Sequence, residues 1–190
     1  PARAQVSSLH ALDPAAGYVL VIAFALLFAH AALGKWRNRW YFEATLANYR
    51  LLPPVLVRPF SLLIPTLEAA VALLLVLAGP RLLGAFTGCA LLLVYALAMG
   101  INLRRDRHDL DCGCVGPAAR RPIARWMVAR NVLLALLLAS SALPWIPRPL
   151  DWTDGLTVAG GVAVTTLLCL AADRLLGQIM PATAALRRAL

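Results

Sequence analysis

Charged side chains are scarce in this sequence of 190 residues. Asp, Glu, Lys and Arg make up 14% of it and hydrophobic residues 61%, whereas a soluble domain is about a quarter charged and about half apolar. Acidic residues are scarcer still, with nine against 18 Lys and Arg, which leaves a net charge of +9. This shortage of charge excludes an ordinary soluble domain and favours a membrane protein, whose excess apolar surface faces lipid.

Other features are missing as well. No nucleic-acid-binding motif accompanies the positive charge, and internal repeats are absent. Four cysteines in 190 residues do not describe a disulfide-stapled secreted domain. The Lys and Arg residues instead gather between apolar runs, as the positive-inside rule describes. We therefore predict a lipid bilayer, and no nucleic acid, as the partner of this surface.

Five apolar runs approach the length of about 20 residues that crosses a hydrocarbon core. They cover residues 15–34, 60–79, 82–103, 123–143 and 156–172, and the last is the shortest. We predict an all-α integral membrane protein, a four-helix transmembrane bundle plus a fifth C-terminal transmembrane helix, with residues 1–190 forming a single membrane domain. The alternative for the first run is a signal peptide cleaved near Ala29-His30-Ala31, but the basic cluster that follows favours a retained helix.

The segments between the runs differ in chemistry. Residues 35–56 alternate basic and aromatic side chains, which is typical of a segment at the headgroup level. Only Pro80 and Arg81 separate the second and third runs, so we expect a tight antiparallel hairpin there. Gly84 and Gly88 give the third helix a small face that permits close helix packing.

The distribution of Lys and Arg predicts the orientation in the membrane. Five lie in residues 35–59, five in 104–122 and three in 173–190, against one each in the N-terminal segment and in the two remaining turns. Because basic loops stay in the cytoplasm, we predict a multi-pass protein of the bacterial cell (inner) membrane. Its N-terminus lies outside and the loop 104–122 lies on the cytoplasmic side.

Ionisable residues within the predicted spans indicate a polar site in the inner half of the bundle. By helical rise, Glu68 lies roughly 12 Å and Arg130 roughly 10 Å from the inner ends of their helices. A charge at such depth is costly unless paired, so we expect an ion pair between them. The alternative is a protonated Glu68 and an Arg130 that reaches the surface. In the same half, we expect His30 to be a hydrogen-bonded packing residue, with a proton carrier as the alternative. Cys169, like Cys89, is expected to be a small buried apolar residue.

Reactive groups, charge and turn residues gather in one segment, INLRRDRHDLDCGCVGP, which begins in the third run. Cys112 and Cys114 stand on either side of Gly113, with three arginines before them and two after. A disulfide between residues two apart needs a tight turn, which Gly113 permits, and such a strained ring exchanges readily with other thiols. The arginines favour the thiolate and Asp109 and Asp111 oppose it, so the balance stays open.

Three hypotheses for this segment follow. The first, which we favour, is thiol–disulfide chemistry with Cys112 and Cys114 as the redox pair, either as an oxidoreductase or as an electron relay across the membrane. The second is a metal site formed with His108 and Asp111, although tetrahedral zinc usually takes four well-separated ligands, and we predict no bound metal. The third is a turn in which the cysteines only pack.

Several stretches together resemble a known family. They are GKWRNRWYFEATLANYRLLPP, IPTLE, and INLRRDRHDLDCGCVGP followed by WMVARNVLLALL. They resemble the methylamine utilisation protein MauE family, part of a wider group of redox-associated membrane proteins that includes the DoxX-like proteins. The likeness covers residues 15–145 and extends more weakly through WTDGLTVAGGVA and LAADRLL. Its most distinctive element is Cys-Gly-Cys followed by Gly116-Pro117, and Val115 stands where Phe or Gly is expected.

The resemblance implies a role that composition does not. MauE-like proteins are associated with maturation of periplasmic methylamine dehydrogenase, whose small (beta) subunit carries many disulfides and a tryptophan-derived quinone cofactor. The implied role is processing, transport or disulfide formation of that subunit, alongside a thioredoxin-like partner, MauD. The family supplies no catalytic residues to carry across, so Cys112 and Cys114 are nominated on their chemistry, with the polar residues of the inner half in support.

Two alternative functions and one conflict accompany this interpretation. A transporter or chaperone-like scaffold would carry structural cysteines, and a quinone-linked DoxX-like subunit would need a quinone pocket; we predict no bound cofactor. A pair that handles periplasmic disulfides should face outward, yet the charge pattern puts it inside. Either the orientation is inverted, or the protein relays electrons across the membrane, or the cysteines have no redox role.

Overall fold

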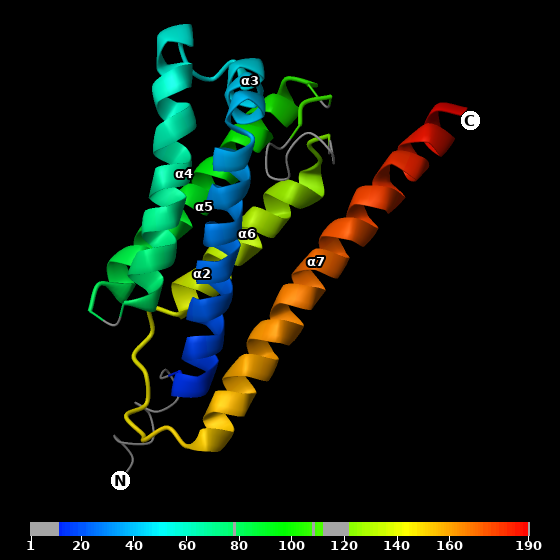
Figure 1. Ribbon diagram of the computed structural model, residues 1–190. Helices are drawn as coiled ribbons and strands as arrows, with labels where there is room; N and C mark the ends of the chain where they lie inside the picture. Colours follow the sequence, from blue (N-terminus) through cyan, green and yellow to red (C-terminus); the bar gives the residue numbers. More distant parts are fainter. Residues whose placement is uncertain (1–11, 78, 108, 112–121, 190) are drawn as a thin grey trace, which may run out of the picture.

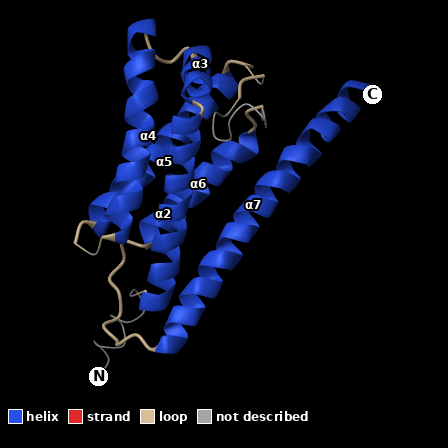
Figure 2. Cartoon of the chain, in the orientation of Figure 1, coloured by secondary structure: helices blue, strands red, loops and turns tan. Residues whose placement is uncertain are grey.

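The computed structural model describes residues 12–77, 79–107, 109–111 and 122–189, without the side chains of 173 and 176–189. Within these residues the regular structure consists of helices, and β-structure is limited to two isolated bridges. The helices, drawn in Figure 2, are α2 (Pro14–Arg37), α3 (Arg39–Tyr49), α4 (Pro54–Val76), α5 (Arg81–Arg104), α6 (Arg125–Ser140) and α7 (Trp152–Ala189). The predicted all-α class is confirmed.

Four of these helices are long and apolar enough to cross a membrane. They are α2, α4, α5 and the part of α7 from Trp152 to Ala172. The remaining predicted span, 123–143, contains α6, which has only 16 residues. At 1.5 Å per residue α6 is about 24 Å long, shorter than a hydrocarbon core of about 30 Å. A bundle of four spans plus a fifth C-terminal one is therefore not shown, whereas four membrane-like helices are.

Local chemistry explains where α6 differs from the prediction. The backbone N–H of Ile123 donates to the carbonyl of Leu110 at 2.8 Å, which keeps the chain extended before Arg125. At the other end, the hydroxyls of Ser140 and Ser141 bond to the carbonyls of Leu137 and Leu138 at 2.6 Å. These bonds compete with helix continuation. The following prolines at 144, 147 and 149 cannot extend the helix.

The short helix α3 occupies the segment for which basic and aromatic alternation predicted a membrane-surface position. Trp40 is 86% exposed and Trp36 47% exposed, as rings at headgroup level would be. Arg50 ends the helix in a left-handed conformation with φ 50°, and Pro54 then stands in the first turn of α4, where proline is tolerated. Helix α4 thus begins earlier than the predicted residue 60.

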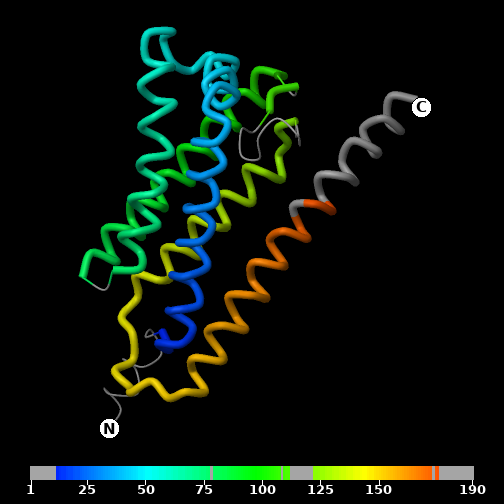
Figure 3. The backbone as a smooth tube through the Cα atoms, in the orientation of Figure 1, coloured from blue at the N-terminus to red at the C-terminus, as the bar shows by residue number. Residues whose placement is uncertain are grey.

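The helices run up and down between two ends of the bundle (Figure 1). At one end, here called the loop end, lie α3, Leu110–Asp111 and Pro122–Ile123. At the other, here called the clamp end, lie Leu12–Asp13, residues 141–151 and the start of α7. Figure 3 shows α7 beginning beside α2 and then diverging from the other helices. Where the two pack, a Cβ added to Gly161 would lie 2.8 Å from Val19.

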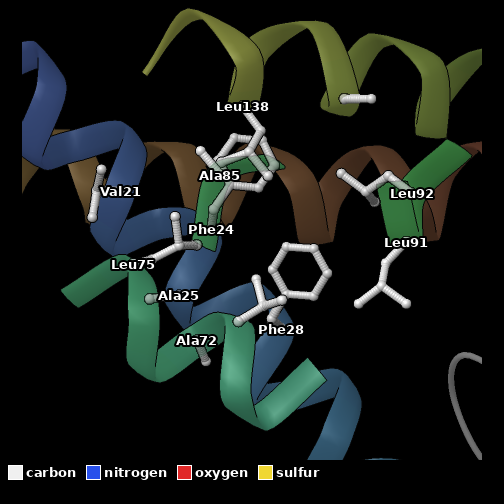
Figure 4. Close-up of a cluster of buried hydrophobic side chains, with 12 residues drawn as sticks. Val21, Phe24, Ala25, Phe28, Ala72, Leu75, Ala85, Leu91, Leu92 and Leu138 are labelled. Carbon is white, nitrogen blue, oxygen red and sulfur yellow. The ribbon is translucent and has the colours of Figure 1, made fainter. Parts of the chain in front are cut away.

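The main hydrophobic core lies between α2, α4, α5 and α6. Figure 4 shows Phe24 and Phe28 of α2 among smaller side chains from the neighbouring helices. A Cβ added to Gly84 would lie 2.9 Å from the backbone nitrogen of Leu75, and one added to Gly88 would lie 2.7 Å from a methyl carbon of Leu138. Both glycines are therefore required for the close packing of α5, as predicted. The hairpin of α4 and α5 is confirmed as well, since the two helices follow a short turn and pack together.

Candidate functional site

A buried ion pair joins α2 to α4 near the loop end. The Lys35 ammonium donates to both carboxylate oxygens of Glu68, at 2.6 Å to Oε1 and 2.8 Å to Oε2. The two side chains are 5% and 1% exposed. The hydroxyl of Tyr95 on α5 donates to Oε1 of Glu68 at 2.7 Å. Three helices thus meet at one carboxylate, and the predicted pairing of Glu68 with Arg130 was wrong.

Lys35 was not predicted as the partner of Glu68, because it directly follows the predicted span 15–34 and begins the basic segment 35–56. Helix α2 in fact continues to Arg37, and Lys35 lies on the same helical face as Ala32 and Phe28, both 1% exposed. Residues three and seven positions apart share a face of an α-helix. The helical spacing therefore indicated the position of Lys35. The buried face of α2 extends to Lys35, so its ammonium can pair with an acidic side chain on a neighbouring helix.

The other predicted supporting residues do not gather at this carboxylate. Arg130 lies on α6 with its guanidinium carbon 5.5 Å from the ring centre of Trp126. His30 is exposed on α2, so its prediction as a packing residue was wrong. Cys169 is exposed on α7, which likewise contradicts its prediction as a buried residue, while Cys89 is half-buried and donates to the carbonyl of Ala135 at 3.3 Å. Among these supporting residues, only Glu68 belongs to the buried site.

The Lys35 ammonium also contacts aromatic rings. It lies 5.4 Å from the ring centre of Phe42 on α3 and 5.4 Å from that of Tyr95. An ammonium within about 6 Å of an aromatic face is attracted by the ring quadrupole, most strongly where water is excluded. Lys35 therefore holds four helices together: its own, α3, α4 and α5.

The predicted redox pair, Cys112 and Cys114, lies outside the described residues, as does His108. The residues on either side of the loop are described, and they are held together. Asp111 and Pro122 form an antiparallel bridge, next to the bond from Ile123 to Leu110. The hydroxyl of Tyr41 on α3 donates to Oδ2 of Asp111. The two described flanks of the loop thus meet at one point, here called the loop base (Leu110, Asp111, Pro122 and Ile123).

A second hydrophobic cluster packs beneath the loop base. It is centred on Tyr49, Met99, Ile123 and Met127, and the partly buried side chains of Leu110 and Tyr95 pack against it. Arg107 supports the same region, because its guanidinium donates to the side-chain oxygen of Asn102 at 3.2 Å and to the carbonyl of Tyr49 at 3.5 Å. The loop base therefore rests on ordered apolar and polar contacts.

A cavity of about 260 Å³ opens beside the loop base. One wall is a face of α3 and the other is the chain on either side of the loop. Its lining residues are Tyr41, Ala44, Thr45, Asn48, Tyr49, Asp109, Leu110, Asp111 and Pro122. Hydroxyl, amide and carboxylate groups line it together with apolar ones, so the cavity can donate and accept hydrogen bonds.

Within the described part of the chain, no three His, Cys, Asp or Glu side chains gather closely enough to hold a metal ion. The metal hypothesis concerned His108, Asp111, Cys112 and Cys114, of which only Asp111 is described. Asp111 is engaged by the Tyr41 hydroxyl. The described residues therefore supply no metal centre, and the hypothesis itself concerns residues outside them.

The clamp end carries a second set of ionic contacts, which is more exposed. Arg148 bonds to Asp13 at 3.0 and 3.1 Å and to Asp154 at 2.7 and 2.8 Å, with side-chain exposures of 33%, 45% and 14%. The hydrogen bond from Arg148 lowers the pKa of Asp13 below its ordinary value. The bonds to Asp154 and then to Asp13 raise the pKa of Arg148. Arg148 thus joins the starts of α2 and α7.

Comparisons with known proteins agree with one another. A family described as methylamine utilisation protein MauE matches residues 13–146. A methylamine utilization protein MauE from Paracoccus denitrificans is 39% identical over 176 residues, covering 92% of this chain and 94% of that protein. A protein of the same name from Methylophilus methylotrophus is 35% identical over 177 residues, covering 90% of each chain. No solved structure matches.

Proposed function

Because this chain belongs to the methylamine utilisation protein MauE family, we propose that it is an accessory membrane protein for maturation of the methylamine dehydrogenase small (beta) subunit. Its part in methylamine utilisation would be processing, transport or disulfide formation of that subunit, alongside a thioredoxin-like partner, MauD. The proposal takes the four membrane-like helices as spans of the bacterial inner membrane, and the segment 123–143 around α6 as the remaining predicted span.

One observation carries the chemical part of the proposal, namely the built loop base. Asp111 is held by Tyr41 and bridged to Pro122, and Cys112 follows Asp111 directly in the chain. The structure thus describes the chain on both sides of the cysteine segment, beside α3 and the cavity. The held flanks support the proposal that the Cys-Gly-Cys segment between them is a reactive site.

The proposed chemistry is thiol–disulfide exchange with Cys112 and Cys114 as the redox pair. A thiolate of the small subunit attacks one sulfur of the loop disulfide, which gives a mixed disulfide and releases the other loop cysteine as a thiolate. A second thiolate of the subunit then attacks the mixed disulfide, so the subunit gains a disulfide and the loop holds two thiols. Exchange with a disulfide of the thioredoxin-like partner restores the loop disulfide. Two electrons pass at each exchange.

Replacing both loop cysteines by serine tests this chemistry. Cys112→Ser with Cys114→Ser should abolish oxidised small subunit in cells grown on methylamine, whereas Cys169→Ser, an exposed cysteine on α7, should leave it unchanged. The measurement is the disulfide content of the subunit after alkylation under non-reducing conditions. Normal subunit with the double variant present would reject redox chemistry and favour the transporter or chaperone-like scaffold.

The side of the membrane is tested separately. Most of the basic residues of the described chain lie in residues 35–59 and 104–125, within or next to the loop end, so the positive-inside rule supports a cytoplasmic loop and an external N-terminus. Direct exchange with the periplasmic subunit instead requires an external loop, in which case an impermeant thiol reagent applied to intact, reduced cells labels Cys112 and Cys114. With the orientation that the charges support, both stay unlabelled until the membrane is opened, and the pair reaches the subunit only by relaying electrons across the membrane. Labelling of either residue in intact cells would invert the orientation and support direct action on a periplasmic substrate.

A further inference from the structure

The buried pair of Lys35 and Glu68 has no place in the chemistry described so far. It is almost completely removed from solvent and lies within helices that have the length and composition of membrane spans. Replacing a buried ion pair by apolar side chains of similar size is often neutral or stabilising. Ionisable residues inside membranes are therefore kept for function more often than for stability.

The geometry of the pair shows what it can do. Lys35 donates to both oxygens of Glu68, and the Tyr95 hydroxyl occupies one of the remaining acceptor positions. A carboxylate held by three such bonds fixes the rotation and the axial position of α2, α4 and α5 relative to one another. Apolar contacts alone would allow these helices to slide, because they are not directional.

Two physical routes lead from this carboxylate to the loop base. The first runs through α3: the Lys35 ammonium lies over Phe42, and the adjacent Tyr41 holds Asp111. The second runs through α5: Tyr95 packs against the hydrophobic cluster that includes Ile123, and Leu110 packs against the same cluster. The two sets of contacts thus reach the loop base on both flanks, at Asp111 and at Ile123.

We propose that Lys35, Glu68 and Tyr95 are positioning residues that set the geometry of the loop base and, through it, the dithiol–disulfide equilibrium of the cysteine pair. The second half of this statement rests on the proposed function. The first half does not, because the position of the loop base is a property of described residues alone. Coupling through a packed network of this size changes an equilibrium by about two- to thirtyfold.

The test uses the full chain in lipid nanodiscs. The double variant Lys35→Met with Glu68→Gln leaves no unpaired charge and keeps an oxygen that can accept the Tyr95 hydroxyl, so the fold should be retained. The first measurement is hydrogen exchange at the amide of Ile123, which bonds to Leu110 across the loop base. We expect its exchange to accelerate about two- to thirtyfold. Exchange at the amide of Leu12, which bonds to the carbonyl of Pro144 at the clamp end, should stay unchanged.

The second measurement is the equilibrium of Cys112 and Cys114 with a glutathione redox buffer, which should shift by a similar factor. The matched control is Arg148→Gln, which removes an ionic contact at the clamp end and should alter neither loop-end measurement. Equal acceleration at Ile123 and Leu12 would mean that the pair only stabilises the whole bundle, and unchanged exchange at Ile123 would mean that it does not position the loop. Either result overturns the inference.

The two proposals fail in different ways. If the wild-type cysteines form no disulfide in any glutathione buffer, the proposed redox function is wrong, whereas hydrogen exchange at Ile123 still decides the positioning role. If exchange is unaffected but Cys112→Ser with Cys114→Ser blocks maturation of the subunit, the redox function stands and the positioning role of Lys35, Glu68 and Tyr95 is rejected.

Discussion

The two ends of the bundle use ionic contacts in opposite ways. At the loop end, Lys35 and Glu68 are buried and bonded at 2.6 and 2.8 Å, so neither can change partner without a large cost. At the clamp end, Arg148 bonds two carboxylates while a third of its side chain stays exposed, and exposed pairs contribute little to stability. The loop end is therefore fixed by buried contacts, whereas the clamp end is held by contacts that water can replace.

The largest effect that would sharpen this comparison is expected from Glu68→Ala. Removing one partner of a buried ion pair leaves the Lys35 ammonium without its counter-charge and typically costs about 3–5 kcal/mol. Thermal unfolding in detergent micelles measures the loss, with the exposed Asp151→Ala as the control. A loss below about 1 kcal/mol, the range of surface pairs, would show that water reaches the pair and that the two ends are alike.

The next effect is expected from Tyr95→Phe, which removes one hydroxyl and keeps the ring beneath the ammonium. A hydrogen bond to a charged group contributes about 1.5–3 kcal/mol, and Glu68 would keep its bonds to Lys35. Denaturant titration of the variant against wild type gives the difference in unfolding free energy. No change in stability would mean that the Tyr95 hydroxyl adds nothing to the fixed end.

At the clamp end, Gly17→Ala tests packing instead of charge. A Cβ at Gly17 would lie 2.5 Å from the indole of Trp145, which is stacked 3.8 Å from the Arg81 guanidinium. The added methyl group must displace the Trp145 indole, which should lower the free energy of unfolding by about 1–3 kcal/mol, as overpacking does. The same unfolding assay applies, and Gly34→Ala is the control because nothing lies within 4 Å of its added Cβ. Equal stability of both variants would show that Trp145 moves freely and that this end is loosely packed.

The smallest effect is a pH dependence confined to the clamp end. Arg148 lowers the pKa of Asp13 in the folded protein. Such a carboxyl stabilises the fold at pH values above the ordinary Asp pKa of about 3.9. This contribution is lost as the pH falls through the lowered pKa of the folded state. Hydrogen exchange at the amide of Ala15, which bonds to Asp13, should therefore accelerate in wild type below about pH 4 relative to Arg148→Gln. Parallel pH profiles for the two proteins would contradict this link.

The positions of most helices were predicted from local sequence patterns, and the errors in their bounds have identifiable physical causes. Apolar run lengths located the four membrane-like helices, and the paired glycines predicted a close helix contact of α5. The structure forms this contact with α4 at Gly84 and with α2, α4 and α6 at Gly88. The predicted span 123–143 was too long because Ile123 is held at the loop base and the serines at 140 and 141 bond back to their own helix. Neither contact changes the hydropathy of the segment, so a hydropathy profile does not detect where the helix begins and ends.

The candidate site was predicted in part. Glu68 was recognised because an acidic residue inside an apolar run must find a partner, but Arg130 was chosen by estimated depth alone. Depth along a helix axis says nothing of the direction in which a side chain points, and Lys35 lies on the buried face of α2. His30 and Cys169 failed for the same reason, since both lie on exposed faces.

The sequence by itself determined the class of this protein, its membrane-like helices, its family and the chemistry available to Cys112 and Cys114, because each follows from composition or from residues adjacent in the chain. Only the tertiary structure decided that Glu68 bonds Lys35 and Tyr95, and that Tyr41 holds Asp111 at the loop base. Those contacts depend on how helices rotate and slide against one another. Side chains from separate helices set that arrangement together, so no single stretch of sequence encodes it.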